Sequence, residues 1–317
     1  MPKPRGLSQE FMSSLKDGLL SPVVERVKKD HTLDFQIREE EVHVYYRGGR
    51  ILGLKPAPCE KEGFNCSFDK KYFDNSEFPA GIEAPPERVT SRSDIDAWIS
   101  ILPHLKQAMD FHHVGTEKNE REFQQLICRE NNYANVSNDT DYFIVDCEYV
   151  NPKFPGRLDL VAFKWRSTGI ARKKGAVCLS FIEVKYADNA LANTSGLREH
   201  VTQISKMAKD PEALEDIKQE MLEVFRQKRD LGLVRFGRGG NNNEVDSFEE
   251  GTPEILLMLI NHKPTSSKLL SELDKLSDEQ KAMVKIVTAN FLGYGLYEKC
   301  VFSHADFIER YSKQLHT

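Results

Sequence analysis

The sequence predicts an α/β protein with a mixed central sheet flanked by helices, preceded by an N-terminal helix and an antiparallel meander. Three observations support this fold class. From residue 116 onward the apolar patterns run helix, strand, strand, strand, helix and a later strand, the element order of an α/β core. The first 95 residues instead show a helical pattern followed by short alternating strands. The 317 residues are 39% hydrophobic and 29% charged, the composition of a globular protein with room for about two domains.

Composition and charge narrow the class of protein further. No run reaches the roughly 18 apolar residues of a membrane helix, and no apolar stretch follows the basic start of the chain, so we expect a cytoplasmic protein without a membrane partner. The six cysteines form no CxxC pair, which makes a disulfide framework or a zinc site unexpected. The net charge of −5 argues against a general nucleic-acid coat protein, but it allows an enzyme with a local basic groove.

Residues 1–95 form the first predicted region, and its role is not indicated by the sequence. Residues 8–30 carry apolar side chains at i+4 spacing and predict a helix that Pro22 interrupts. Strands are predicted at residues 33–38, 42–46, 50–54 and 63–69, with Gly48 and Gly49 as a hairpin turn. Tyr45 and Tyr46 stand beside arginines and could stack on bases, although a hairpin with a core-facing tyrosine fits the pattern better.

The second predicted domain spans residues 96–317. Helices are predicted at residues 93–112, 116–129, 197–209, 212–231, 266–276, 278–284 and 303–315, with Ser93 and Ser303 as N-caps of the first and last. Thr116 and Asn119 form an imperfect capping box. Strands are predicted at residues 142–149, 158–163, 177–185, 254–261 and 286–292. Residues 237–252 are rich in Gly and Asn and predict a mobile loop.

The chemistry is expected where strands 158–163 and 177–185 form a hairpin. Asp159 begins the first strand and Glu183 ends the second, so their carboxylates lie side by side. Side chains alternate along a strand, so Glu183 and Lys185 share a face while Val184 points into the core. Two carboxylates and the Val184 carbonyl suit a hard divalent cation, Mg²⁺ or Mn²⁺, and Lys185 would position or deprotonate an attacking water. Alone, the Glu-Val-Lys triplet fits a chance solvated ion pair, and its place in the order of elements is what favours a site.

Asp159, Glu183 and Lys185, set on neighbouring strands between a glutamate-bearing helix and a further helix, resemble the PD-(D/E)xK nuclease superfamily, the restriction-endonuclease-like fold. The resemblance covers roughly residues 116–209, and Leu158 stands where the family has a proline before the first aspartate. It implies a Mg²⁺-dependent phosphodiesterase, a deoxyribonuclease, with Asp159, Glu183 and the Val184 carbonyl as metal ligands. Roles in restriction, phage defence or repair are plausible on the same ground.

The resemblance also implies a helix glutamate and a supporting glutamine. Glu120 lies close to the apolar direction of its helix and precedes apolar residues at i+3 and i+7, so it is preferred over Glu122. Both also fit solvated charges near a helix N-terminus. Gln203 and His200 flank the apolar face of the helix at residues 197–209. Gln203 is the candidate that would support the metal-bound water or the lysine, and an exposed polar helix residue is equally compatible with the pattern.

Basic residues are concentrated around the hairpin, with seven Lys and Arg against one acid between residues 153 and 174, so we expect the basic connection to lie beside the two acids. Nucleic-acid backbone contacts are expected from Arg157, Lys164, Arg166, Lys173 and Lys174. DNA is preferred over RNA as the partner, and a homodimer is an open arrangement.

Two other functions compete with a nuclease. The first is a non-catalytic nucleic-acid-binding or interaction subunit that keeps the fold, although the intact acid pair and lysine argue against it. The second is a two-carboxylate glycosidase, which needs no following lysine. An aromatic content of 9% also provides no sugar-stacking platform for such an enzyme.

Overall fold

The computed structural model describes residues 5–58, 62–73, 83–114, 119–133, 139–151, 153, 156–191, 196–234, 244–261, 267–289, 298 and 301–312. They form a mixed α/β structure with two sheets, which confirms the predicted fold class. The chain divides into two compact units: residues 3–125 with 226–234, and residues 126–225 with 235–317. The sequence placed the end of the first region at residue 95. The division in the structure lies later, because the helix after that point packs with the N-terminal sheet.

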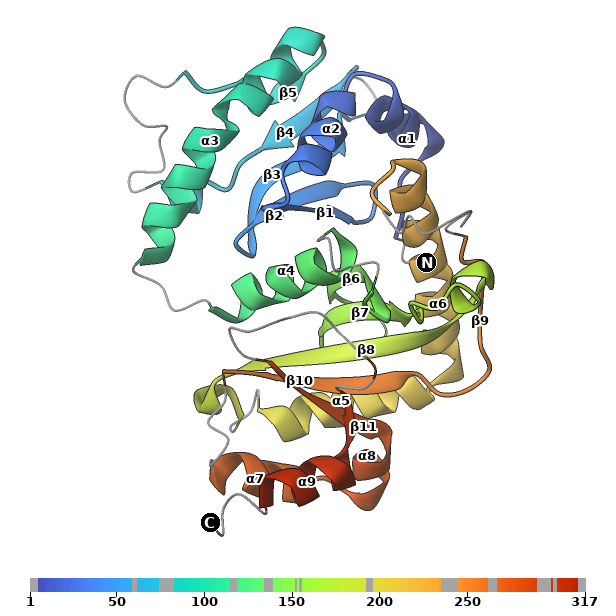
Figure 1. The fold of residues 1–317 in the computed structure, drawn as a ribbon. Coiled ribbons are helices and arrows are strands. Elements are labelled where there is room, and N and C mark those ends of the chain that lie inside the picture. Colours follow the sequence, from blue (N-terminus) through green and yellow to red (C-terminus); the bar gives the residue numbers. More distant parts are fainter. Residues whose placement is uncertain are drawn as a thin grey trace. The chain divides into compact units, whose positions relative to one another are not determined.

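The first unit is built on a five-stranded antiparallel meander in the order β1-β2-β3-β4-β5 (Figure 1). Its elements are α1 (Gln9–Lys16), α2 (Ser21–Lys29), β1 (Leu33–Ile37), β2 (Val42–Tyr46), β3 (Gly49–Pro56), β4 (Phe64–Ser67), a 3-10 turn (Lys70–Tyr72), β5 (Arg88–Val89) and α3 (Arg92–Val114). The interruption predicted at Pro22 is confirmed. This proline lies in the first turn of α2, where its missing N–H leaves no helical bond unmade.

The hairpin turn between β2 and β3 consists of Arg47 and Gly48, one residue earlier than predicted. Tyr46 pairs with Gly49 across the turn, and the two residues between them have φ of 49° and 73°. Positive φ at both positions is what a type I′ turn requires. The prediction of Gly48 and Gly49 as the turn is therefore wrong by one position. In addition, a Cβ at Gly48 would lie 2.5 Å from the backbone of Arg121.

One of the two predicted helix caps is confirmed and the other is wrong. Helix α3 begins one residue before Ser93, and its cap is formed by Ser91 and Asp94. The backbone N–H of Ser91 donates to Asp94 Oδ2 at 2.8 Å, and the N–H of Asp94 donates to Ser91 Oγ at 3.3 Å. At α9, the N–H of Asp306 donates to Ser303 Oγ at 3.1 Å, as the predicted N-cap requires.

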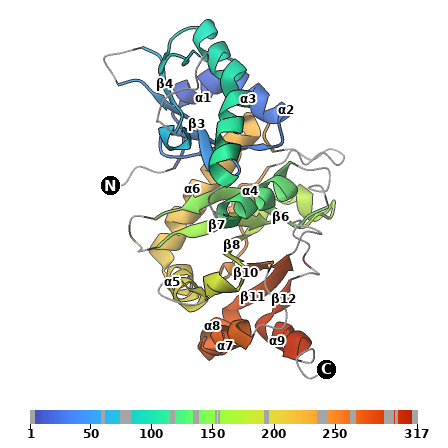
Figure 2. The same cartoon turned by 90° about the vertical axis from the view of Figure 1, so that its left-hand side faces the viewer.

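The second unit is built on a mixed sheet in the order β12-β11-β10-β8-β7-β6, with β9 added to the start of β8 (Figures 1 and 2). Strand β7 is antiparallel to both of its neighbours, β6 and β8, whereas β8, β10 and β11 are parallel. The elements are β6 (Tyr142–Tyr149), β7 (Leu158–Lys164), β8 (Ala176–Tyr186), α5 (Leu197–Lys209), β9 (Ser247–Phe248), β10 (Glu254–Ile260), α7 (Ser267–Asp274), α8 (Asp278–Met283), β11 (Val284–Ala289), β12 (Phe302–Ser303) and α9 (His304–Ser312), with 3-10 turns at Ala171–Lys173 and Asp188–Leu191. Helices α4 (Asn119–Asn132) and α6 (Pro211–Asp230) contribute residues to both units.

The sheet order follows from the apolar patterns. Residues 255–260 of β10 are all buried, as expected for a parallel strand covered on both faces. A parallel neighbour needs a crossover connection, and α5 and α6 provide it between β8 and β10. Phe225 of α6 packs against Phe143, Phe163 and Trp165, with ring centroids 5.2–5.9 Å apart. Helices α7, α8 and α9 gather at the β11 and β12 edge (Figure 2).

Several sequence predictions fall partly on residues outside the described ranges. The loop predicted at residues 237–252 contains β9, and residues 235–243 lie outside the described residues. Thr116 of the predicted capping box also lies outside them, as do residues 290–292 of the last predicted strand. Among the helices that the structure describes, none is long and apolar enough to cross a lipid bilayer.

Candidate metal and catalytic site

Asp159 and Glu183 occupy adjacent positions on the antiparallel strands β7 and β8. The strand pairing ends with Leu160 opposite Ile182, and the two acids come one residue beyond this pair. Asp159 is 2% exposed and Glu183 is completely buried. Where the ladder ends, the Val184 N–H donates to Asp159 Oδ2 at 2.8 Å, so the aspartate side chain takes the place of a ladder carbonyl. The structure therefore brings together the two carboxylates that the sequence predicted to be neighbours.

Two nitrogens converge on one oxygen of the Glu183 carboxylate. Lys185 Nζ lies 2.6 Å from Glu183 Oε1, and this lysine is itself buried. His200 Nδ1, from the first turn of α5, contacts the same oxygen and lies 3.4 Å from Lys185 Nζ. Both contacts are at ion-pair distance, but neither nitrogen is aligned for a hydrogen bond to the carboxylate. Within the described residues, both Glu183 oxygens thus lack an aligned donor.

This cluster buries more acid than permanent base. Asp159 and Glu183 carry two formal negative charges, Lys185 carries one formal positive charge, and the His200 ring is a further contact of Glu183; the two acids and the lysine are removed from water. Two buried carboxylates side by side repel each other, and a bound cation would relieve this cost. The orphaned Glu183 oxygens and the hard oxygen donors fit Mg²⁺ or Mn²⁺. No group of three His, Cys, Asp or Glu side chains poised for a metal occurs in the described part of the chain. The Val184 carbonyl stays a predicted third ligand.

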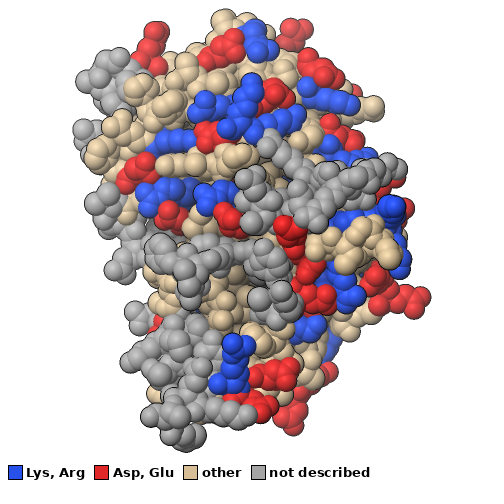
Figure 3. Space-filling model, viewed as in Figure 1, with Lys and Arg blue, Asp and Glu red and all other residues tan. Residues whose placement is uncertain are grey.

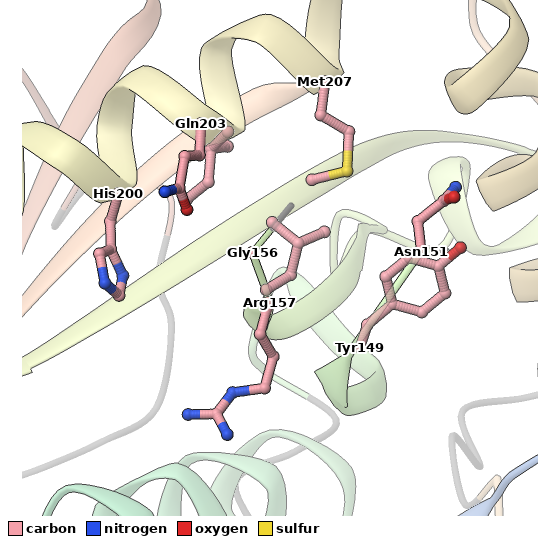
Figure 4. Close-up of a pocket in the computed structure, with 9 residues that line it drawn as sticks. Tyr149, Asn151, Gly156, Arg157, His200, Gln203 and Met207 are labelled. Carbon is pink, nitrogen blue, oxygen red and sulfur yellow. The ribbon is translucent and has the colours of Figure 1, made fainter. Parts of the chain in front are cut away.

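A small pocket of about 10 Å³, partly open to solvent, lies beside this cluster (Figure 4). His200, Gln203 and Met207 descend into it from α5, opposite Gly156 and Arg157. Gly156 has φ of 113°, and a Cβ there would lie 2.5 Å from Gln203 Oε1, so the backbone and the glutamine approach each other closely. The side-chain amide of Gln203 donates to Glu199 Oε1 at 3.0 Å, so Gln203 lines the pocket and forms its hydrogen bond within its own helix.

The predicted nucleic-acid cations separate into two groups. Arg157 lines the pocket beside the acids and pairs with Glu148 at 2.7 Å. The other four cations lie at the opposite end of the β7–β8 hairpin. Asp159 is near the start of β7 and Glu183 is near the end of β8, whereas the connection joins the end of β7 to the start of β8. Five residues of strand separate that end from Asp159, about 17 Å. The expectation of a basic connection beside the acids is therefore corrected. Those far-end cations are Lys164, Arg166, Lys173 and Lys174.

Lys164 is already engaged at the far end in a polar cluster around Glu254. Its Nζ lies 3.2 Å from Glu254 Oε1 and 3.0 Å from Glu298 Oε1. Tyr142 donates to Glu254 at 2.6 Å, and Lys285 contacts it as well. Burial pushes the pKa of the Glu254 carboxyl upward, but the surrounding donors and cations outweigh burial and hold that pKa below its usual value.

The remaining far-end cations differ in their availability. Arg166 pairs with Glu298 at 3.0 Å on the surface. Lys173 and Lys174 are exposed. On the face drawn in Figure 3, acidic and basic side chains are intermixed, so gross charge does not mark an interface there.

The two helix glutamates considered from the sequence belong to the first unit, whereas the acid pair belongs to the second. Glu122 is engaged within its own unit, where both carboxylate oxygens accept from Arg47 at 2.8 and 3.1 Å. This bidentate pair weakens the case for Glu122 as the alternative helix carboxylate. The assignment of Glu120 stays a prediction.

His200 is the site residue that the sequence did not select. His200 and Gln203 both flank the apolar face of this helix, and the sequence pattern does not distinguish one from the other. In the structure it contacts Glu183, whereas Gln203 bonds within its own helix. Comparisons with protein-family models, with curated proteins and with solved structures found no match to this chain.

Proposed function

We propose that the protein is a divalent-metal-dependent nuclease that hydrolyses phosphodiester bonds, with DNA as its substrate. The observation that carries the proposal is the fully buried Glu183, whose oxygens lack an aligned hydrogen-bond donor among the described residues, placed beside buried Asp159 and Lys185. A structural ion pair would need only one carboxylate for one lysine. The second buried acid favours a cation site over a simple ion pair.

The chain's own residues would divide the work at this site. Asp159, anchored by the Val184 N–H, and Glu183 would hold the cation. A bound Mg²⁺ or Mn²⁺ would polarise the phosphodiester and lower the pKa of a coordinated water. Lys185 reaches the same point from β8 and would orient the attacking water and contact the scissile phosphate. Arg157 would exchange its surface partner Glu148 for a phosphate oxygen of the substrate.

Deoxyribonuclease activity is tested by incubating the protein with plasmid, linear duplex, single-stranded DNA and RNA, in Mg²⁺, Mn²⁺ or EDTA. We expect cleavage of DNA that EDTA abolishes and that Asp159→Asn and Lys185→Ala each reduce by at least about 100-fold. The control is Lys268→Ala, which changes an exposed lysine on α7. Cleavage that persists in both site variants would contradict the proposal. DNA binding without cleavage in any metal would favour the non-catalytic alternative.

A further inference from the structure

His200 stands out because it links a fully buried carboxylate to the pocket. Its side chain is 27% exposed, whereas that of Glu183 is 0% exposed. It comes from the first turn of α5, a helix that is fixed by the buried side chains of Leu197, Val201 and Ile204. The imidazole is therefore held on a rigid element, and its placement against Glu183 follows from the packing of the helix.

The contact divides the two oxygens of Glu183 into different roles. A carboxylate only accepts hydrogen bonds, so Nδ1 supports Glu183 in the imidazole form that carries a hydrogen on this nitrogen. In that form its 3.4 Å approach to Lys185 Nζ is a contact and not a hydrogen bond. His200 Nδ1 and Lys185 Nζ both approach Oε1. Neither of these contacts is made to Oε2, which is buried and accepts no hydrogen bond from a described residue. The carboxylate thus has one oxygen that both nitrogens contact and a second oxygen that we consider the one available to a cation.

We infer that His200 is a positioning residue that fixes the rotation of the Glu183 carboxylate, so that Oε2 is the oxygen presented to the divalent cation. This inference rests on the proposed function, because it assumes that Glu183 binds a metal. Lys185 alone would not suffice for the task, since its flexible ammonium is also needed at the water and the phosphate. A ring nitrogen on a rigid helix would keep the carboxylate oriented after the lysine leaves it. Partners of this kind contribute roughly 10–100-fold to metal affinity.

Three substitutions separate this role from a general loss of packing. His200→Asn keeps an N–H donor close to the place of Nδ1. His200→Gln extends the amide toward the place of Nε2, and His200→Ala removes both. Lys206→Ala is the matched control, because Lys206 is exposed on the same helix. His200 is partly exposed, so we expect all four proteins to fold and to unfold thermally within a few degrees of the wild type in EDTA.

Mn²⁺ binding measured by titration calorimetry, without DNA, is the direct readout. We expect the dissociation constant to rise roughly 10–100-fold in His200→Ala and His200→Gln and by less than about 3-fold in His200→Asn. In DNA cleavage, raising Mn²⁺ should restore the turnover of His200→Ala while the KM for DNA stays unchanged. Wild-type affinity in His200→Ala would overturn the inference, and so would an equal loss in the Asn and Ala variants. Failure of the proposed function is distinguishable, because the wild type itself would then bind no Mn²⁺.

Discussion

The close approach of Gly156 to Gln203 gives a prediction that does not depend on knowing the substrate. Replacing Gly156 by alanine adds one methyl group at a position with φ of 113°, where side chains are strained. The new Cβ would also lie 2.5 Å from Gln203 Oε1. Both effects act on the pocket wall beside the acids, and the substitution leaves the buried core untouched.

The expected loss of stability comes mainly from the backbone. A side chain held in a sparsely populated φ/ψ region costs about 1–3 kcal/mol. The glutamine is a flexible side chain and can move away, which forfeits only its exposed bond to Glu199. At about 2–4 °C for each kcal/mol in a unit of this size, Gly156→Ala should lower the unfolding midpoint by about 2–12 °C. DNA cleavage should fall as well, because Gln203 is displaced from the pocket.

Scanning calorimetry with a matched glycine control measures this effect. Gly169 belongs to the same unit, has no atom within 4 Å of an added Cβ, and is not among the glycines with positive φ. Gly169→Ala should therefore unfold within about 1 °C of the wild type. Adding Gln203→Ala to Gly156→Ala removes the close contact but leaves the backbone strain, so most of the loss should remain. A Gly156→Ala protein as stable as Gly169→Ala would refute the reasoning.

Two further predictions concern the far end of the hairpin. Glu254 has a lowered pKa in the folded state, so its stabilising contribution is present above the usual glutamate pKa of about 4.3 and is lost as pH falls through the lowered value. Glu254→Gln should thus be less stable than the wild type at pH 7 but lose less stability on acidification. Urea unfolding from pH 7 to pH 3 measures this difference. An equal decrease in the free energy of unfolding of both proteins over this range would contradict the prediction. If Lys173 and Lys174 contact DNA phosphates, changing both to alanine should weaken binding and reduce the slope of log K against log salt by about 1.8, with turnover at saturating DNA unchanged. An unchanged slope would exclude them from the interface, and Lys268→Ala serves as the control.

Much of the fold could be predicted because its elements carry strong, regular patterns. The bounds of α5 and β6 agree with the predicted residues 197–209 and 142–149, and β10 was evident from its unbroken apolar run. Elements of two residues, such as β5, β9 and β12, are too short to produce a pattern and depend on neighbouring strands. The N-cap of α3 was predicted at the wrong serine, because Ser91 and Ser93 are both suitable N-cap residues. Only the hydrogen bonds with Asp94 show that Ser91 is the cap.

The site was predictable to the extent that it depends on strand geometry. Alternation and a hairpin suffice to place Asp159, Glu183 and Lys185 together. The location of the basic connection was predicted incorrectly because nearness along the chain was taken for nearness in space. The sequence also could not predict whether His200 or Gln203 contacts Glu183. Both flank one helix face, and only the packing of α5 determines which of them reaches the carboxylate.

The central claim is that Asp159 and Glu183 form a binding site for a divalent cation. Titration calorimetry of Mn²⁺ into the wild type, Asp159→Asn and Glu183→Gln tests it most directly, with Glu254→Gln as a control for removing a mostly buried carboxylate that already has cation partners. We predict binding to the wild type and to Glu254→Gln, and loss of that binding in both site variants. Equal Mn²⁺ affinity in all four proteins, or no binding to the wild type, would contradict the claim.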